Sequence, residues 1–549
     1  MSTFSEIARR AGGWLPLIGV TAMVGTLTTL ALPTVLGHAI DSIVASEDSV
    51  RWLALAVGLI ALGIIVDLVS VFAGTACVVG TTAWLRNRLV RHLLAIGPEG
   101  FRRFETGDLV TRISGNATDA ARAGPSLVTV GSAVLPTLGS LVMLAYIDLW
   151  VAGAFLAGVA LVALVLKTFT QRTAAVVTSY QRTQGRIAAR LTESLAGVRT
   201  IAAAGTVERE ELRVLEQLPD LHDEGRQSWQ VLSTTVAQAA VVGPLVTVVV
   251  LAAGGLALSQ GRISPGDLFA AAQYAAIGAG LGSLTGSFGA FARARAGVHR
   301  AAEVLTVAPV EHGRRELSEG PGRLEFRNVT ARAGDVTLLH DIDLALPGGA
   351  AVAIVGCSGA GKSVLAALAA RLRDPDEGEV LLDGVPLSDL SHQALRTAVG
   401  CAFERPVLVG ATVADVIGMG LEAGQVQSAA RATHAHEFVS RLPLGYNTPL
   451  TDAPMSGGEA QRLGLARAWH AQRLLVLDDA TSSLDMVTEM QISRTLTGDH
   501  GGRTRLIVTH RVSTAARADL VVWLENGRVR AVGPHQRLWD HPDFRKVFG

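Results

Sequence analysis

The sequence predicts an all-α domain of about six membrane-spanning helices, followed by an α/β domain. One observation is composition, because a mean hydropathy of +0.36 with 17% charged residues is too apolar for an ordinary soluble protein. Another is that apolar stretches of spanning length occur only before residue 305 of the 549-residue chain. The third is the segment Gly356–Ser363, which fits a phosphate-binding loop between a strand and a helix.

Apolar stretches define the first domain, and basic residues set its orientation. The stretches cover residues 13–38, 54–82, 125–147, 149–168, 233–258 and 266–290. Basic residues cluster beside alternate ends of these stretches, at Arg9–Arg10, Arg86–Arg91, Lys167–Arg172 and Arg293–Arg295. Because such residues are enriched on the cytoplasmic side of a membrane, we expect both termini and the C-terminal domain to be cytoplasmic.

Two polar segments between the predicted spans, residues 84–124 and 169–232, are rich in Ala, Leu and Arg and poor in turn residues. That composition predicts helices that continue beyond the bilayer. At a rise of about 1.5 Å per residue, a helix of about 30 residues projects about 45 Å. We expect these segments to transmit motion to the cytoplasmic domain.

The loop Gly356–Ser363 reads Gly-Cys-Ser-Gly-Ala-Gly-Lys-Ser and follows the strand-like run Ala351–Val355. Its glycines let backbone N–H groups turn toward phosphates, and the following helix adds a positive dipole. Lys362 is predicted to reach the outer phosphates and Ser363 to bind Mg²⁺. The predicted nucleotide contacts in the loop are Gly356, Ser358, Gly359, Ala360, Gly361, Lys362 and Ser363.

These patterns predict a transmembrane domain at residues 1–305, a linker at 306–322 and a nucleotide-binding domain at 323–549. Basic charge comes almost entirely from arginine, since lysine occurs only at positions 167, 362 and 546. The 48 basic side chains are balanced by 48 acidic ones, so the sequence favours no nucleic-acid partner.

A buried-strand pattern, Leu474–Asp479, ends in two carboxylates. Asp478 is predicted to hold Mg²⁺, and Asp479 to face the attacking water. A strand with this ending is typical of proteins that hydrolyse a nucleoside triphosphate.

The segment Met455–Glu459 starts a predicted helix between these two motifs. Ser456 and Glu459 have capping-box spacing, which by itself indicates only a well-started helix. The adjacent glycines, Gly457 and Gly458, fit better with a helix N-terminus whose backbone approaches an anion.

Over essentially its whole length the chain resembles the ATP-binding cassette superfamily, as an exporter-type half-transporter of the type IV fold. The matched residues are the Walker A loop Gly356–Ser363, the signature Met455–Glu459, the Walker B residue Asp478, the D-loop Ser482–Asp485 with its Asp485, and the switch histidine His510. Phe101–Asp119 and Glu193–Glu208 resemble the two intracellular coupling segments of the family.

The resemblance implies an ATPase coupled to transport, with ATP and Mg²⁺ as ligands, in the inner or plasma membrane of a bacterium. It also implies two chains arranged head to tail. Each ATP would lie between the Walker A loop of one chain and the signature of the other. Ser456, Gly457, Gly458 and Glu459 would then contact ATP held by the partner chain.

Three positions depart from the family pattern around one nucleotide. Asp479 stands where the family has a glutamate that polarises water, and its side chain is shorter by one methylene, about 1.5 Å. Glu404 replaces the Q-loop glutamine and is a candidate residue of the Mg²⁺ site, with Arg405 beside it. No aromatic residue stands near Ala333 to stack on adenine, and Arg332 is the candidate to replace it.

These departures predict a chain that holds ATP but hydrolyses it slowly, as the degenerate-site subunit of a heterodimer. The alternatives are a slow homodimeric exporter, an importer of siderophore-like cargo, and an ATP-gated membrane regulator. An amphipathic small molecule, peptide or lipid is the expected cargo. Asp67 lies within the second apolar stretch, where a charge faces either the cargo pathway or a neighbouring helix.

Overall fold

The computed structural model describes residues 2–279, 282–419, 421–498 and 502–548. Within these ranges, side chains are described except at residues 2–4, 8, 162–178, 181, 232, 235–236, 238–240, 242, 279, 282–285 and 288. The chain forms two compact units. One contains Met1–His92 and Glu105–Thr306, and the other contains Leu93–Phe104 and Val307–Gly549.

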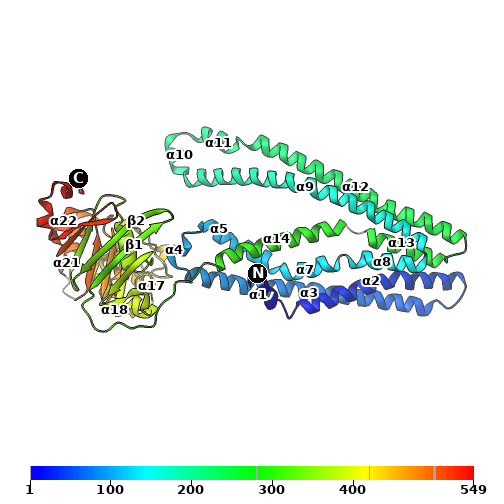
Figure 1. Cartoon of the computed structure of the whole chain (residues 1–549), viewed down its shortest axis with the longest axis horizontal. Coiled ribbons are helices and arrows are strands. Elements are labelled where there is room, and N and C mark those ends of the chain that lie inside the picture. The colour runs from blue at the N-terminus through cyan, green and yellow to red at the C-terminus, as the bar shows by residue number, and fades with distance from the viewer. Residues whose placement is uncertain (1, 280–281, 420, 499–501, 549) are drawn as a thin grey trace. The chain divides into compact units, whose positions relative to one another are not determined.

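The first unit is helical throughout its described elements (Figure 1). Its helices are α1 (Ser2–Arg10), α2 (Leu15–Val44), α3 (Val50–Ala95, which ends in the second unit), α5 (Thr106–Thr111), the π-helix η1 (Arg112–Asn116), α6 (Ala117–Ala121), α7 (Ala123–Ser132), α8 (Leu135–Ile147), α9 (Leu149–Ala196), α10 (Val198–Ala204), α11 (Val207–Leu215), α12 (Leu218–Ser259), α13 (Pro265–Ala279) and α14 (Gly282–Leu305). Each predicted apolar stretch overlaps one or two of these helices. The last stretch, 266–290, includes residues 280–281, which lie outside the described residues.

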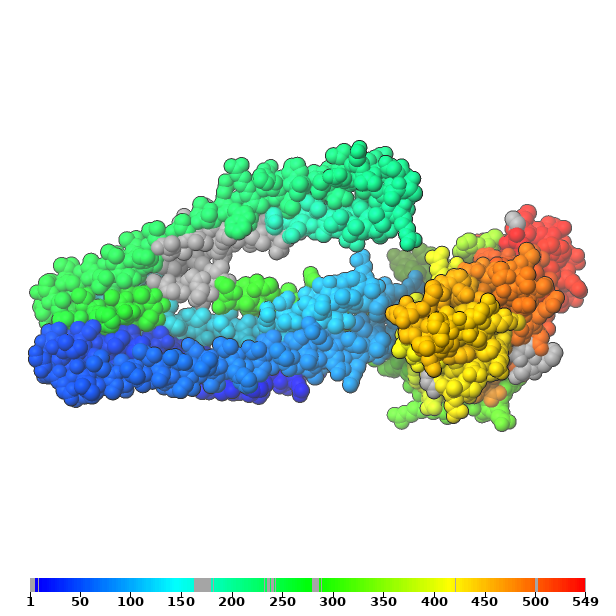
Figure 2. Space-filling view, turned by 180° about the vertical axis from the view of Figure 1, so that it is seen from behind, coloured from blue at the N-terminus to red at the C-terminus, as the bar shows by residue number. Residues whose placement is uncertain are grey.

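Three described segments are long and apolar enough to cross a membrane, namely Leu15–Val44, Val50–Ala95 and Thr106–Ile147. Shorter apolar helical stretches, Leu149–Leu161 and Gly243–Ser259, lie within α9 and α12. In the space-filling view, the blue surface belongs to the first helices of the chain (Figure 2). The predicted membrane domain is therefore present as a set of long helices.

Close approach of α2 and α13 depends on two glycines and one aspartate. A Cβ atom on Gly266 would lie 2.1 Å from the carbonyl oxygen of Gly37. Asp41 of α2 accepts hydrogen bonds from Ser264 Oγ (2.6 Å) and Gly266 N (2.8 Å) at the start of α13. Its carboxylate therefore serves as the N-terminal cap of a helix far away in sequence.

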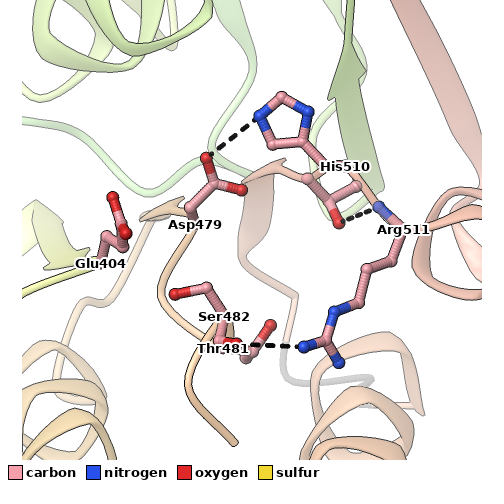
Figure 3. Close-up of a pocket in the computed structure, with 7 residues that line it drawn as sticks. Glu404, Asp479, Thr481, Ser482, His510 and Arg511 are labelled. Atoms are coloured by element: carbon pink, nitrogen blue, oxygen red, sulfur yellow. Dashed lines mark hydrogen bonds and ion pairs between the residues drawn. The ribbon is translucent and has the colours of Figure 1, made fainter. Parts of the chain in front are cut away.

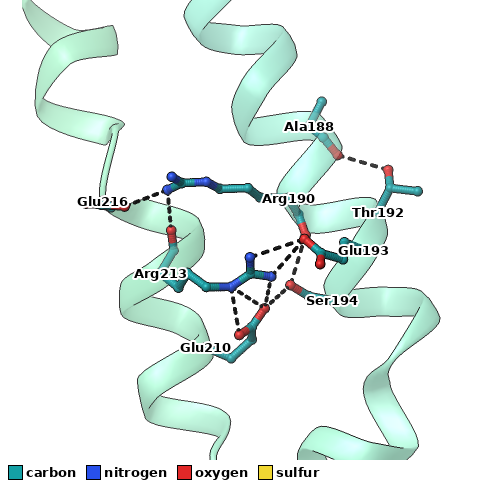
Figure 4. A network of polar contacts seen from close by, with 8 residues as sticks. All are labelled: Ala188, Arg190, Thr192, Glu193, Ser194, Glu210, Arg213 and Glu216. Atoms are coloured by element: carbon teal, nitrogen blue, oxygen red, sulfur yellow. Dashed lines mark hydrogen bonds and ion pairs between the residues drawn. The ribbon is translucent and has the colours of Figure 1, made fainter.

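The polar end of the α9–α12 hairpin is held by charged side chains (Figure 4). Arg213 of α11 pairs with Glu210 at 2.6 Å and with Glu193 of α9 at 3.1 Å. Hydrogen bonds from Arg213 and Ser194 lower the pKa of Glu210 to about 2. Arg190 adds an ion pair to Glu216 at 2.7 Å. These bonds connect the C-terminal part of α9 to α11 and the residue after it, and of the residues named only Glu193 and Ser194 belong to the predicted coupling segment Glu193–Glu208.

In the second unit, two sheets share one hydrophobic core. The strands are β1 (Leu324–Ala333), β2 (Val336–Leu346), β3 (Ala351–Val355), β4 (Glu377–Leu382), β5 (Val385–Pro386), β6 (Val399–Phe403), β7 (Leu474–Asp478), β8 (Thr504–Val508), β9 (Leu520–Glu525) and β10 (Arg528–Gly533). The four-stranded sheet has the order β2-β1-β4-β5 and is antiparallel. The six-stranded sheet has the order β10-β9-β3-β8-β7-β6 and is parallel except for β10.

Short helices surround these sheets. They are α4 (Gly97–Phe101), α15 (Lys362–Ala369), η2 (Leu387–Asp389), α16 (His392–Ala398), α17 (Val413–Gly418), α18 (Ala423–Ala432), α19 (His436–Val439), η3 (Gly445–Asn447), η4 (Leu450–Asp452), α20 (Gly457–Ala468), α21 (Met486–Gly498), α22 (Val512–Arg517), α23 (His535–Trp539) and α24 (Pro542–Arg545). Carboxyl ends of neighbouring parallel strands meet at one edge of a sheet. The segments that follow β3, β6, β7 and β8 therefore gather there, which positions the site.

Removing the cap that joins α2 to α13 should lower the stability of the first unit. We expect Asp41→Ala to cost about 1 kcal/mol of unfolding free energy, because Gly266 N and Ser264 Oγ lose their acceptor. Asp41→Asn keeps an acceptor and should stay close to wild type. Thermal unfolding in detergent measures both, with the exposed Glu47→Ala as control. Equal melting temperatures for Asp41→Ala and Glu47→Ala would contradict this capping role.

Candidate nucleotide-binding site

The phosphate loop connects the fully buried strand β3 to helix α15. Gly359 and Gly361 adopt positive φ angles of 81° and 95°, in a region that disfavours other residues. Gly356 has no room for a side chain, because a Cβ atom there would lie 2.3 Å from the carbonyl oxygen of Leu524. Two different constraints, conformation and space, therefore explain the glycines. The other two predicted contacts differ in burial, since Ser358 is exposed and Ala360 is buried.

Lys362 and Ser363 occupy the first turn of α15. Lys362 is buried, and its Nζ donates hydrogen bonds to the carbonyl oxygens of Gly356 (2.9 Å) and Cys357 (3.0 Å). Burial lowers the pKa of Lys362, and the nearby carboxylates, led by that of Asp479, oppose the shift. The ammonium is thus desolvated, and among the described residues its hydrogen-bond partners are carbonyl groups of the loop, an environment that an anionic phosphate would improve.

Ser363 faces the end of strand β7. Its Oγ donates a hydrogen bond to Asp478 Oδ1 at 2.9 Å. Hydroxyl and carboxylate oxygens are ligands that Mg²⁺ accepts, with water and phosphate oxygens completing its shell. The two residues therefore fit a magnesium ion bound together with a nucleotide.

Beside this pair lies a cavity of about 250 Å³ (Figure 3). It is lined by Glu404, Asp479, Thr481, Ser482, Thr509, His510 and Arg511. These residues follow strands β6, β7 and β8, whose carboxyl ends are adjacent in the sheet. Sheet topology therefore unites positions that are up to about a hundred residues apart in sequence.

Asp479 and His510 face each other across this cavity, with Asp479 Oδ2 3.6 Å from His510 Nε2. Burial raises the pKa of Asp479, and His510 and Lys362 act against that shift. Asp479 also has φ of +47°, an uncommon conformation for a residue with a side chain. Its short carboxylate is therefore fixed by an unusual backbone as well as by its neighbours.

Glu404 brings a further carboxylate to the cavity. Its charge adds to burial in raising the pKa values of Asp478 and Asp479. Arg405 lies 3.9 Å from Glu404, and its side chain is 91% exposed. A contact that long and that exposed contributes little, so the negative charge of Glu404 remains in the cavity.

The signature forms the capping box that its spacing predicts. Glu459 N donates to Ser456 Oγ at 3.3 Å, and Ser456 N donates to Glu459 Oε2 at 2.8 Å. Ser456 and Gly457 are exposed, while Gly458 packs near the D-loop, where a Cβ atom would lie 3.2 Å from Ser483 O. The start of α20 therefore combines a stable helix end with an accessible backbone.

Three predicted site residues do not line this cavity. Asp485 caps α21 by accepting hydrogen bonds from Val487 N (3.1 Å) and Thr488 N (2.9 Å). The guanidinium of Arg332 pairs with Glu377 of β4 at 2.6 Å, and this bond competes with stacking on a base. Asp67 is exposed on α3, and no hydrogen bond or ion pair joins its side chain to another of the described side chains.

Sequence reasoning missed the contacts that connect the loops behind the cavity. Arg511, directly after His510, donates to Ser482 O at 3.1 Å and forms an ion pair with the buried Glu489 of α21. Gln461 of α20 forms hydrogen bonds with the loop after β6, at Glu404, and with the D-loop. Its position two residues after the signature is the only signal in the sequence that could have drawn attention to it.

The long helices of the first unit and the nucleotide site of the second define an ATP-binding cassette transporter of the exporter type, and the chain belongs to that family. Two family models match it, "ABC transporter transmembrane region" over residues 15–279 and "ABC transporter" over residues 339–482. The chain is accordingly an ATPase coupled to transport that uses ATP with Mg²⁺. It is a multi-pass protein of the bacterial inner membrane with a cytoplasmic nucleotide-binding domain.

The relatives and the solved structure described next each match most of this chain. The ABC transporter ATP-binding protein RamA of Streptomyces coelicolor is 46% identical over 97% of this chain and 85% of its own length. An ATP-dependent lipid A-core flippase of Alkalilimnicola ehrlichii is 31% identical over 84% of this chain and 82% of its own. The solved structure of a bacterial Atm1-family ABC exporter with ATP bound aligns with a TM-score of 0.78 and 26% identity, covering 98% of this chain and 97% of that one.

Loss of the buried ammonium should weaken nucleotide binding. We expect Lys362→Ala to reduce ATP affinity by about 10- to 100-fold, because a charge-assisted hydrogen bond contributes about 1.5–3 kcal/mol. Titration with a fluorescent ATP analogue measures the effect on the detergent-solubilised transporter. Lys546→Ala is the matched control, since that amine is 75% exposed and pairs with Asp543. Similar affinities for the two variants would contradict the assignment of Lys362.

Proposed function

We propose that this chain is the degenerate-site subunit of a heterodimeric exporter, which holds ATP at its own Walker motifs and hydrolyses it slowly. The carrying observation is the cavity of Figure 3, where Asp479 replaces the longer glutamate of the family and Glu404 replaces a neutral glutamine. The shorter base stands farther from an attacking water, and a misplaced general base typically costs about 10²- to 10⁴-fold in rate. The added carboxylate places a further negative charge beside the phosphates.

Binding residues remain suited to their task under this proposal. Lys362 contacts the outer phosphates, while Ser363 and Asp478 hold Mg²⁺, which neutralises phosphate charge and orients the bound nucleotide. Ser456, Gly457 and Gly458 contact the nucleotide on the partner chain, a role supported by the exposure of Ser456 and Gly457 at the start of α20. His510 and Asp479 complete the slow site, in which Arg332 exchanges its ion pair with Glu377 for stacking on the base, in place of the missing ring.

Transport follows from the two ATP-bound interfaces. ATP at this chain's loop stabilises the closed pair of nucleotide-binding domains, and hydrolysis at the partner's site reopens it. The coupling segments Phe101–Asp119 and Glu193–Glu208 pass that movement to the membrane helices. The second of these segments includes Glu193, which Arg213 connects to Glu210 (Figure 4).

For the cargo, we propose an amphipathic molecule, in line with the apolar helices and with the name of the related lipid A-core flippase. Asp67 contributes selection of a cationic group on that cargo. An exposed carboxylate within a spanning helix is costly in lipid, and a water-filled pathway relieves that cost.

Turnover by the purified chain alone tests the degenerate site. We expect less than about 1 s⁻¹ with Mg-ATP, at the low end of ordinary enzyme rates. Asp479→Glu should raise turnover by about tenfold or more in the complete transporter, because the longer carboxylate reaches the water. Robust turnover by the chain alone would instead support a homodimer with two working sites.

Replacing the charge at Asp67 tests the cargo assignment. We expect Asp67→Asn to reduce uptake of a cationic amphipathic cargo into inverted vesicles by about tenfold, equivalent to one charge-assisted hydrogen bond. ATP turnover should fall much less. Asp48→Asn, in the exposed loop between α2 and α3, is the matched control. Equal losses of uptake and turnover would remove Asp67 from the pathway.

A further inference from the structure

Gln461 lies in the second turn of α20, and its side chain is almost completely buried, with 1% of the residue exposed. Its Nε2 donates to the carbonyl oxygen of Glu404 at 2.6 Å and to Ser482 Oγ at 3.0 Å. Its Oε1 accepts a hydrogen bond from Ser483 N at 2.9 Å. Both N–H groups and the oxygen of the amide are thus engaged.

Orientation of this amide follows from its partners. A backbone N–H can only donate, so Oε1 must face Ser483 N, and a backbone carbonyl can only accept, so Nε2 must face Glu404 O. Ser482 Oγ is then the acceptor of the second N–H. A buried amide with this pattern discriminates strongly against any side chain that lacks a donor on one side and an acceptor on the other.

The three partners of the amide belong to two loops: Glu404 to the loop after β6, and Ser482 and Ser483 to the D-loop after β7. Glu404 follows β6 and lines the cavity of Figure 3, and Ser482 lines the same cavity from the D-loop. Arg511 reinforces the D-loop by donating to Ser482 O, and it is held in turn by Glu489. Gln461 itself belongs to α20, the helix that begins within the signature Met455–Glu459, and lies two residues after Glu459.

We propose that Gln461 is a positioning residue that couples the signature helix to the two loops bordering this chain's own Walker B carboxylates. Movement of α20 as Ser456 and Gly457 close on a partner-held nucleotide then displaces Glu404 and Ser482–Ser483 together. The inference rests on the proposed composite sites, because it concerns communication between a nucleotide on the partner and a nucleotide on this chain.

Hydrogen-bond chemistry makes the position testable by an isosteric change. Gln461→Glu keeps the size and the acceptor for Ser483 N, but an ionised carboxylate has no donor for Glu404 O. Burial, the facing carbonyl and the nearby carboxylates of Glu404 and Asp479 all favour the protonated form, and Arg511 and Lys362 favour the ionised one. Protonation restores one O–H donor, so acidification should rescue this variant.

The experiment measures Mg-ATP turnover of the complete transporter, as a ratio to wild type at each pH. At about pH 8 we expect Gln461→Glu to lower kcat roughly tenfold with little change in KM, because the phosphate contacts are intact. At about pH 6 the ratio should recover to roughly one third or more. Gln461→Leu, which has no titratable group, should be low at both pH values.

Gln472→Glu is the matched control, because Gln472 is exposed in the same domain and its variant should follow wild type at both pH values. A merely structural role for Gln461 would lower the melting temperature of the variants without a pH-dependent kcat ratio. Wild-type kcat in Gln461→Leu, or a Gln461→Glu ratio that is the same at both pH values, would overturn the proposal. If the proposed composite ATP sites were wrong, rather than the role of Gln461, Lys362→Ala would leave transport intact. Transport by Lys362→Ala therefore separates the two failures.

Discussion

The nucleotide site depends on a buried positive charge that has no acidic hydrogen-bond partner in the part of the chain that the structure describes. Lys362 is desolvated, and its ammonium is bound by two loop carbonyl groups. Carbonyl dipoles compensate a buried charge only in part, whereas a phosphate adds the opposite charge and stronger, charge-assisted hydrogen bonds. The loop geometry that keeps the ammonium there depends on Gly359 and Gly361, whose positive φ angles turn the backbone inward. Affinity for a polyphosphate is thus inherent in the folded loop.

The membrane unit solves a different problem, because apolar helices gain little from each other's surfaces in lipid. Packing between α2 and α13 relies on small residues and on polar groups that satisfy one another. Gly37 and Gly266 permit backbone contact, and Asp41 supplies acceptors to the first turn of α13. The pairing of α2 with α13 therefore rests on close backbone contact and on a few specific hydrogen bonds.

Much of this architecture could be predicted from the sequence, because each signal is local. The apolar stretches, the loop Gly356–Ser363 and the capping box of Ser456 and Glu459 are patterns within a single element, and the structure contains them. Contacts between distant loops were beyond such reasoning. Gln461 reaches Glu404 across 57 positions and Ser482 across 21, distances that no periodicity encodes.

Asp479 and Arg332 illustrate the same limit at single residues. The sequence revealed a short carboxylate at Asp479 but not its left-handed backbone, which depends on how the chain leaves β7. Arg332 was a reasonable stacking candidate by charge, yet the register that places Glu377 of β4 within 2.6 Å is a property of the sheet. The charge and size of a residue can be read from the sequence, whereas its partners depend on the tertiary structure.

Scarcity of lysine gives the burial of Lys362 a practical meaning. The only other primary amine on a side chain after residue 307 is that of Lys546, which is 75% exposed. A reagent that acylates amines therefore meets one hidden target and one open reference within the same domain. The relative labelling of the two reports directly on how tightly the loop encloses its lysine, without any engineered probe.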